Sequence, residues 1–122
     1  MIRTDGLTHL HLVVGDLERS VRFYREVFGM QELFREGSTM VFLRTPGAAD
    51  TVTLNADPAL HHLAGNSGGV QHAGFRLVDK ADLDDAIQQV VSAGGRLLRR
   101  GEHEPGHPFA YVSDPDGYTL EL

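Results

Sequence analysis

The feature that most constrains this chain is an order of predicted elements that occurs twice. A strand is followed by a helix and three further strands, and after a loop the same order begins again. The first strand of each half carries a histidine at the matching place, His9 and His72, 63 residues apart (72 − 9). Few residues are identical between the halves, so the pattern, rather than matching letters, indicates an internal duplication.

The first half begins with a predicted strand over Leu7 to Val14. Leu10, Leu12 and Val14 alternate with His9, His11 and Val13, so one face of this strand carries imidazoles. Asp16 is placed to cap a helix that Gly29 would end, and the apolar residues between them recur at helical spacing: Leu17, Val21, Tyr24 and Phe28. Three more strands are predicted over Met30 to Glu36, Thr39 to Thr45 and Thr51 to Asn55.

The second half follows a turn-rich loop over residues 57–69 that contains His61 and His62. Val70 to Val78 alternates again, with His72, Gly74 and Arg76 on one face. Asp79 can cap a second helix, which Gly94 and Gly95 would end. The last strands are predicted over Arg96 to Arg100, Phe109 to Ser113 and Tyr118 to Leu122, with a turn at Asp114 to Gly117.

This order predicts an α+β fold. A length of 122 residues suits a single domain, which we divide into module 1 (about 5–56), the loop (57–69) and module 2 (about 70–122). Each βαβββ module would place one helix on one face of a four-stranded sheet and leave the other face free. The paired modules are expected to form an open, incompletely closed barrel-like cavity with the helices outside.

Composition excludes several classes of function. The 11 basic and 17 acidic residues give a formal net charge of −6, and no basic cluster suits a nucleic acid. The absence of cysteine excludes disulfides, thiolate metal sites and a cysteine nucleophile. No apolar run approaches the roughly 18 residues of a membrane span, and Met1 to Asp5 lacks a signal-peptide core. We therefore expect a cytoplasmic protein with a small-molecule partner and no membrane or nucleic-acid partner.

Three side chains point to a metal centre. Alternation in the last strand places Glu121 on the free face together with His9 and His72. If the halves pack face to face, two imidazoles and one carboxylate meet and leave coordination positions open, as in non-haem iron(II) oxygenases. Thr53 occupies the place in the first half that matches Glu121, and a threonine hydroxyl is a poor ligand for a transition metal. The chain therefore offers three strong ligands rather than four.

Four stretches resemble the vicinal oxygen chelate superfamily, which contains glyoxalase I, fosfomycin-resistance thiol transferases, methylmalonyl-CoA epimerase, extradiol dioxygenases and bleomycin-binding proteins. They are residues 7–17, 23–29, 71–75 and 114–122. The resemblance covers nearly the whole chain. It implies paired βαβββ modules, metal ligands at His9, His72 and Glu121, and a homodimer whose sites can be shared between chains.

Departures from individual members separate the possible activities. Glyoxalase I typically has a glutamate at the position of Thr53, which weakens that assignment. The acidic stretch over residues 101–107 disfavours the phosphonate chemistry of the fosfomycin transferases, and bleomycin-binding proteins generally lack the ligands kept here. Extradiol dioxygenases carry a tyrosine where Tyr111 stands, but fosfomycin transferases can share it.

We therefore expect a metal-dependent enzyme that binds two vicinal oxygens of a small substrate, most specifically an extradiol-type dioxygenase. Iron(II) or manganese(II) is favoured, and zinc(II) or nickel(II) is possible. Tyr111 would orient the substrate, with substrate contacts from His11, Thr53 and His62. A glyoxalase-type lyase or isomerase and a non-catalytic antibiotic-binding protein are the alternatives. His103 and His107 are interpreted as surface loop residues.

Overall fold

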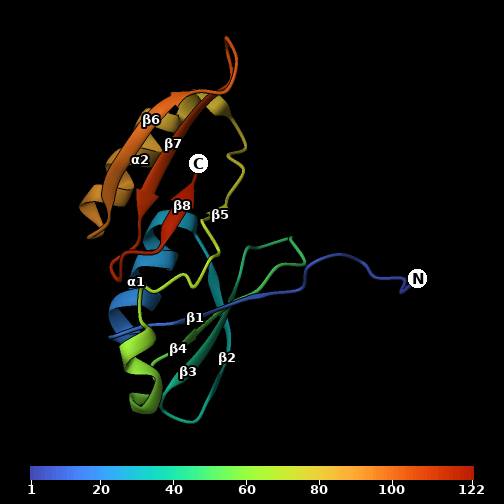
Figure 1. The fold of residues 1–122 in the computed structure, drawn as a ribbon, viewed down its shortest axis with the longest axis vertical. Helices are drawn as coiled ribbons and strands as arrows, with labels where there is room; N and C mark the ends of the chain where they lie inside the picture. The colour runs from blue at the N-terminus through green and yellow to red at the C-terminus, as the bar shows by residue number, and fades with distance from the viewer. The chain divides into compact units, whose positions relative to one another are not determined.

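The computed structural model describes residues 1–122, which divide into two compact units, Met1–Ala64 and Gly65–Leu122. Figure 1 shows the elements of both units along the chain. Each unit contains one four-stranded mixed sheet and one α-helix, which confirms the predicted α+β class. Neither α-helix has the length and hydropathy that crossing a membrane requires.

The first unit contains a sheet whose strands are ordered β1-β4-β3-β2. β1 runs parallel to β4, and the other neighbours are antiparallel. Helix α1 packs against β3 and β4, and a 3-10 helix, η1, follows the sheet. The elements are β1 (Leu10–Val13), α1 (Leu17–Phe28), β2 (Gln31–Glu36), β3 (Met40–Arg44), β4 (Val52–Asn55) and η1 (Pro58–Leu63).

Both predicted ends of α1 are confirmed. The Asp16 carboxylate accepts a hydrogen bond of 2.9 Å from the backbone N–H of Arg19, as an N-cap does. Gly29 ends the helix in the left-handed region at φ 62°, where a side chain would be strained. Val21 and Tyr24 of the predicted apolar stripe are buried, and Phe23, outside that stripe, is also buried.

The second unit repeats this arrangement with strand order β5-β8-β7-β6. β5 runs parallel to β8, the other pairs are antiparallel, and α2 packs on β6 and β7. A short 3-10 helix, η2, precedes α2. The elements are β5 (Ala73–Gly74), η2 (Lys80–Asp82), α2 (Leu83–Ser92), β6 (Arg96–Glu102), β7 (Pro108–Ser113) and β8 (Thr119–Glu121).

The two sheets share strand register as well as topology. In the first sheet Thr53 is paired with His11 on one side and Phe42 on the other. In the second sheet Glu121 is paired in the same way with Gly74 and Tyr111. β2 and β6, the second strands of their units, also have a register shift at the same place. The shift lies between Glu32 and Phe34 in β2 and between Leu97 and Arg99 in β6. The backbone therefore repeats where the side chains have diverged.

The first strand of each unit, β1 or β5, is shorter than predicted. The prediction of a strand over Val70 to Val78 is wrong in length, because only Ala73 and Gly74 pair as a strand. Their partner strand β8 has only three residues, and this limits the length over which β5 can pair with it. β8 begins at Thr119, directly after the turn in which Oδ1 of Asp114 accepts from the backbone N–H of Tyr118 at 2.9 Å. β1 likewise begins at Leu10, so His9 precedes it.

Two other boundaries differ from the sequence prediction. The loop over residues 57–69 contains η1, since the Asp57 carboxylate accepts from the Ala59 N–H at 2.9 Å and Pro58 suits the first helical position. β6 continues to Glu102, beyond the predicted end at Arg100, because Glu102 still pairs with Pro108. The face of β6 therefore extends two residues further than alternation suggested.

Candidate metal centre

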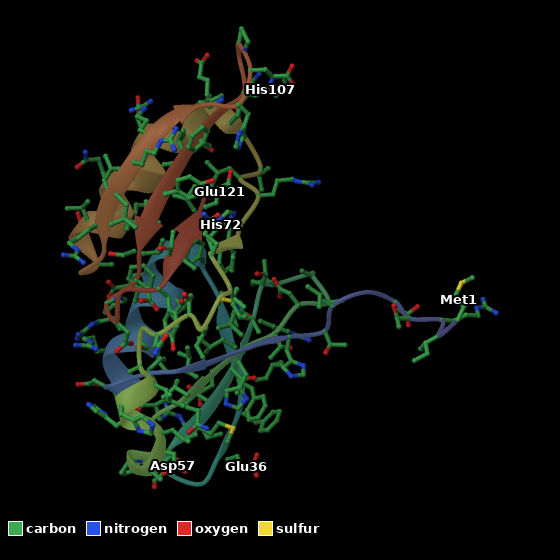
Figure 2. The ribbon with its side chains drawn as sticks, in the orientation of Figure 1. Met1, Glu36, Asp57, His72, His107 and Glu121 are labelled. Carbon is green, nitrogen blue, oxygen red and sulfur yellow. The ribbon has the colours of Figure 1, made fainter.

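The candidate centre begins with a contact between His72 and Glu121. Nε2 of His72 lies 2.8 Å from Oε2 of Glu121, and the two side chains are 25% and 22% exposed. Figure 2 labels both residues where β5 and β8 lie side by side. The parallel register places Gly74 beside Glu121, and His72 lies two residues before Gly74 on the same face. The structure thus brings together two of the three predicted ligands.

His103 also contacts Glu121, and the sequence reading missed this residue. Its Nε2 lies 2.7 Å from Oε1 of Glu121, and its ring stacks on Phe109 with centroids 4.4 Å apart. The interpretation of His103 as a surface loop residue agrees with its 59% exposed side chain, but it did not include this contact. Had β6 been extended past Arg100, alternation through Gly101 would have placed His103 on the open face.

Tyr111 lies beside the same pair. It faces Glu121 across the β7–β8 ladder, and its ring centroid is 5.0 Å from that of His72 and 5.3 Å from that of Phe109. Tyr111 is half-buried and makes no hydrogen bond through its hydroxyl. The open face of the second sheet therefore carries an imidazole, a carboxylate and a free phenol next to one another.

His9 lies in the first unit and is exposed. Its Nδ1 is 2.7 Å from the hydroxyl of Thr8, the residue before it. Nδ1 of His72 is likewise 3.0 Å from the side-chain oxygen of Gln71, again the residue before it. Ligating histidines usually have the second ring nitrogen held by such a partner, which fixes ring and tautomer. Each of these histidines therefore directs Nε2 away from its own neighbour.

The three predicted substrate contacts also lie in the first unit. His11 is exposed on β1 and is paired in register with Thr53. Thr53 is 1% exposed, and its Oγ1 has no hydrogen-bond partner, which is costly for a buried hydroxyl. His62 lies exposed in η1 and makes no hydrogen bond or ion pair.

Neither unit by itself provides a complete metal site. In neither unit do three histidine, aspartate or glutamate side chains converge in a way that could hold a metal ion. His72 and His103 contact different oxygens of Glu121, so their nitrogens do not share one point. The second unit alone therefore supplies an imidazole and a carboxylate, a donor pair of the right chemistry but two ligands only.

The clearest electrostatic effect lies away from this pair. Arg35 bonds Glu18 with an Nη1–Oε1 distance of 2.5 Å and also bonds Glu32. The hydrogen bond from Arg35 is the main reason that the pKa of Glu18 lies below its ordinary value. Stability from this group is present above the ordinary carboxyl pKa and is lost as pH falls through the lowered value. Both side chains are exposed, so solvent and salt weaken the effect.

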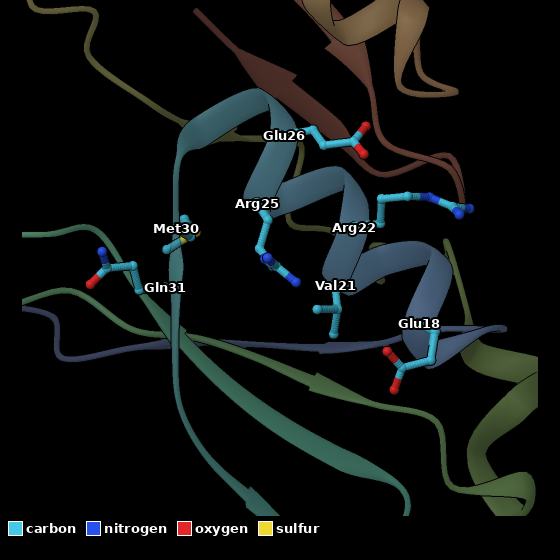
Figure 3. Close-up of a pocket in the computed structure, with 7 residues that line it drawn as sticks. All are labelled: Glu18, Val21, Arg22, Arg25, Glu26, Met30 and Gln31. Atoms are coloured by element: carbon cyan, nitrogen blue, oxygen red, sulfur yellow. The ribbon is translucent and has the colours of Figure 1, made fainter.

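A groove of about 590 Å³ lies elsewhere in the first unit, along α1 and the start of β2 (Figure 3). Its lining includes both signs of charge: Glu18, Val21, Arg22, Arg25, Glu26, Met30 and Gln31. None of the candidate ligands lines it. We therefore do not assign the chemistry to this groove.

Comparison with known proteins identifies the family. The model of the Glyoxalase/Bleomycin resistance protein/Dioxygenase superfamily matches residues 6–122. The chain therefore belongs to this superfamily, as its motifs and repeated sheets suggested. A crystal structure of a glyoxalase-related enzyme from Fulvimarina pelagi has the same fold, with a TM-score of 0.72 and 26% identity over 97% of this chain and 86% of that one.

The similar curated proteins are enzymes with different activities. The chain is 29% identical to a manganese-dependent 2,3-dihydroxybiphenyl 1,2-dioxygenase of Geobacillus genomosp. 3, over 93% of the chain but only 35% of that enzyme. It is 33% identical to a probable lactoylglutathione lyase of Vibrio parahaemolyticus, over 95% of the chain and 88% of the relative. It is also 33% identical to the glutathione transferase FosA of Serratia marcescens, over 97% of the chain and 79% of that enzyme. The chain spans about a third of the length of the dioxygenase.

Proposed function

We propose that this protein is a metal-dependent enzyme that binds two vicinal oxygens of a small substrate and acts as an extradiol-type dioxygenase. The observation that supports this most is the 2.8 Å contact between Nε2 of His72 and Oε2 of Glu121 on an open sheet face. An imidazole nitrogen and a carboxylate oxygen directed at each other are the donors that a divalent transition metal would take. The similarity to a manganese-dependent dioxygenase agrees with this choice.

In the proposal, His9 supplies the third ligand. His9 and His72 have equivalent places before the first strand of each sheet, and each has Nδ1 held by the side chain of the preceding residue. Two imidazoles and one carboxylate would occupy one side of the ion and leave positions for substrate. When bound, an iron(II) or manganese(II) ion would supply Lewis acidity to two neighbouring substrate oxygens and lower the pKa of a substrate hydroxyl.

The other side chains orient the substrate. The Tyr111 hydroxyl has no partner within the chain and is placed next to the His72 ring, so it can donate a hydrogen bond to a substrate oxygen. His11 and Thr53 form a second polar position on the first sheet, and His62 is the proposed contact from η1. The phenyl ring of Phe109 adds an apolar wall beside Tyr111. Such a face suits an aromatic diol better than an aliphatic polyol.

A glyoxalase-type lyase or isomerase is the second candidate. The similarity to a probable lactoylglutathione lyase favours it, since that relative is matched over 88% of its length. Thr53 argues against it, because this residue occupies the position that matches Glu121 and cannot supply a strong fourth metal ligand. Antibiotic binding without turnover is the third candidate, and it would require no metal.

The test is metal content followed by activity. We expect about one iron or manganese ion per chain in purified protein, and loss of that metal in His72→Ala and Glu121→Ala variants that keep the far-ultraviolet circular dichroism spectrum. His107→Ala, in the β6–β7 turn, is the matched control and keeps the metal. Full metal occupancy in the His72 and Glu121 variants would contradict the ligand assignment.

Activity then separates the candidates. Protein prepared without oxygen and loaded with iron(II) or manganese(II) is given a panel of catechols while oxygen uptake is recorded. The same protein is tested for isomerisation of hemithioacetals. Oxygen uptake supports the dioxygenase, isomerisation alone supports the lyase, and drug binding by metal-free inactive protein supports the third candidate.

A further inference from the structure

The open face of the second sheet carries an arginine, Arg99, that forms no ion pair with a carboxylate. Arg99 on β6 is paired in register with Tyr111 on β7, and Tyr111 is paired with Glu121 on β8. Residues paired in register point to the same face of a sheet. The three side chains therefore form one row across the sheet, with arginine at one end and the candidate ligand at the other.

The neighbouring arginine shows that Arg99 points away from the helix. Arg100 is paired with Ala110, which faces the core, and its guanidinium bonds Asp84 of α2. Because successive side chains of a strand alternate, Arg99 must lie on the opposite, open face. No carboxylate lies within ion-pair distance of Arg99, whereas Arg100 and Arg35 are both paired.

A neutral ring supports the Arg99 side chain. Its guanidinium carbon lies 5.6 Å from the centroid of Phe109, within the range of a cation–π contact. The Phe109 ring can lie across the strand because Gly101 has no side chain, and an added Cβ would come within 2.9 Å of the ring. The contact with Phe109 restrains the guanidinium but leaves its charge and its hydrogen-bond donors available.

We propose that Arg99 binds a carboxylate group of the substrate. This inference rests on the proposed function and specifies its substrate class. A planar guanidinium presents a fork of N–H donors that matches a carboxylate, and one arginine balances one negative charge. Strands lie about 4.8 Å apart, so the backbones at Arg99 and Glu121 are about 10 Å apart. A catechol with a short acidic side chain would extend along this row and cover Tyr111.

The experiment measures binding without turnover. Manganese(II)-loaded protein is titrated calorimetrically, in the absence of oxygen, with 3-(3,4-dihydroxyphenyl)propanoate and with the corresponding propanamide. We expect the wild type to bind the carboxylate about tenfold more tightly than the amide. Arg99→Met should reduce this ratio to about one, whereas Arg100→Met, the matched control on the helix side, should leave it unchanged.

Several results would overturn the assignment. One is the absence of a carboxylate preference in the wild type, and another is a preference that survives in a folded Arg99→Met variant. Arg76, which is exposed after β5, is the competing cation. Loss of the preference in Arg76→Met but not in Arg99→Met would place the anion site elsewhere.

A second probe pair separates this inference from the proposed function. Metal-free protein is titrated with 3-phenylpropanoate and 3-phenylpropanamide, which lack vicinal oxygens, and binding is followed by nuclear magnetic resonance. If the carboxylate preference requires Arg99 in both pairs but the catechols gain nothing from metal, the anion site stands and the vicinal-oxygen function fails. If metal strengthens catechol binding without any carboxylate preference, the function stands and the role of Arg99 fails.

Discussion

At the scale of single residues, the candidate centre depends on which atoms of each side chain already contact another side chain. Glu121 has both oxygens in contact, with His72 at Oε2 and His103 at Oε1. A carboxylate held at one oxygen by a neighbour presents the other in a fixed direction. We therefore interpret His103 as a positioning residue for Glu121 rather than as a metal ligand.

This interpretation predicts a change in metal affinity. His103→Ala should weaken manganese(II) binding about tenfold, because hydrogen-bond partners of ligands commonly contribute 10- to 100-fold in affinity. His103→Gln keeps a side-chain donor and should recover most of the loss. Affinity is measured by electron paramagnetic resonance of free manganese(II). His107→Ala is the control, and equal affinities for His103→Ala and wild type would show that the contact does not position Glu121.

At the scale of secondary-structure elements, the turn before β8 sets the place of Glu121. Asp114 is 2% exposed, and its Oδ1 accepts from the backbone N–H groups of Asp116, Gly117 and Tyr118 at 2.9–3.0 Å. The sequence predicted this turn, and the structure confirms it. The cluster of three N–H donors explains why an aspartate is buried here, since a carboxylate satisfies them together.

Removal of this acceptor should destabilise the fold. Asp114→Ala removes the acceptor of the half-buried N–H groups of Asp116 and Tyr118, whereas the exposed N–H of Gly117 keeps the backbone carbonyl of residue 114 as acceptor. We expect a loss of about 2 to 3 kcal/mol in the free energy of unfolding. Asp114→Asn keeps an acceptor oxygen and should cost less. Urea denaturation followed by circular dichroism gives both values. If the alanine variant were as stable as wild type, the turn would not depend on this carboxylate.

The same scale explains how the two halves have diverged. Thr53 and Glu121 occupy equivalent positions in two sheets with the same register, yet Thr53 is buried and Glu121 is half-buried. The partners differ correspondingly, since Thr53 lies between His11 and Phe42, while Glu121 lies between Gly74 and Tyr111. The surroundings of the buried threonine and of the half-buried carboxylate therefore differ, although the strand register is the same.

At the scale of the whole molecule, the resemblance to the superfamily predicts a homodimer whose sites take ligands from both chains. A mixing experiment tests this prediction. His9→Ala and Glu121→Ala are each expected to lose metal alone, and a refolded equal mixture should recover metal at up to about half of the sites in mixed dimers. No recovery in mixtures that do contain mixed dimers would show that each site draws its ligands from one chain.

Much of the architecture could be predicted from local sequence signals. The caps at Asp16 and Gly29, the turn at Asp114 and the alternation of Leu10, Leu12 and Val14 all concern residues a few positions apart. The chemistry of those residues alone decides such features. The same signals placed Glu121 and His72 on an open face, where the structure has them in contact. The length of β5 was predicted wrongly because it depends on β8, a partner strand distant in the sequence. The end of β6 was predicted wrongly because it depends on pairing with β7, which alternation along one strand does not show.

The sequence by itself therefore determined the repeated order of elements, the open face that His72 and Glu121 share, and the superfamily. Periodicity and capping are local, so they can be read along the chain. Tertiary structure alone decided that His103 meets Glu121, that Arg99 shares a row with Tyr111, and that the Thr53 hydroxyl is buried without a partner. These contacts depend on strand register, which is set by pairing between residues far apart and shifts wherever a bulge or a hairpin adds one residue.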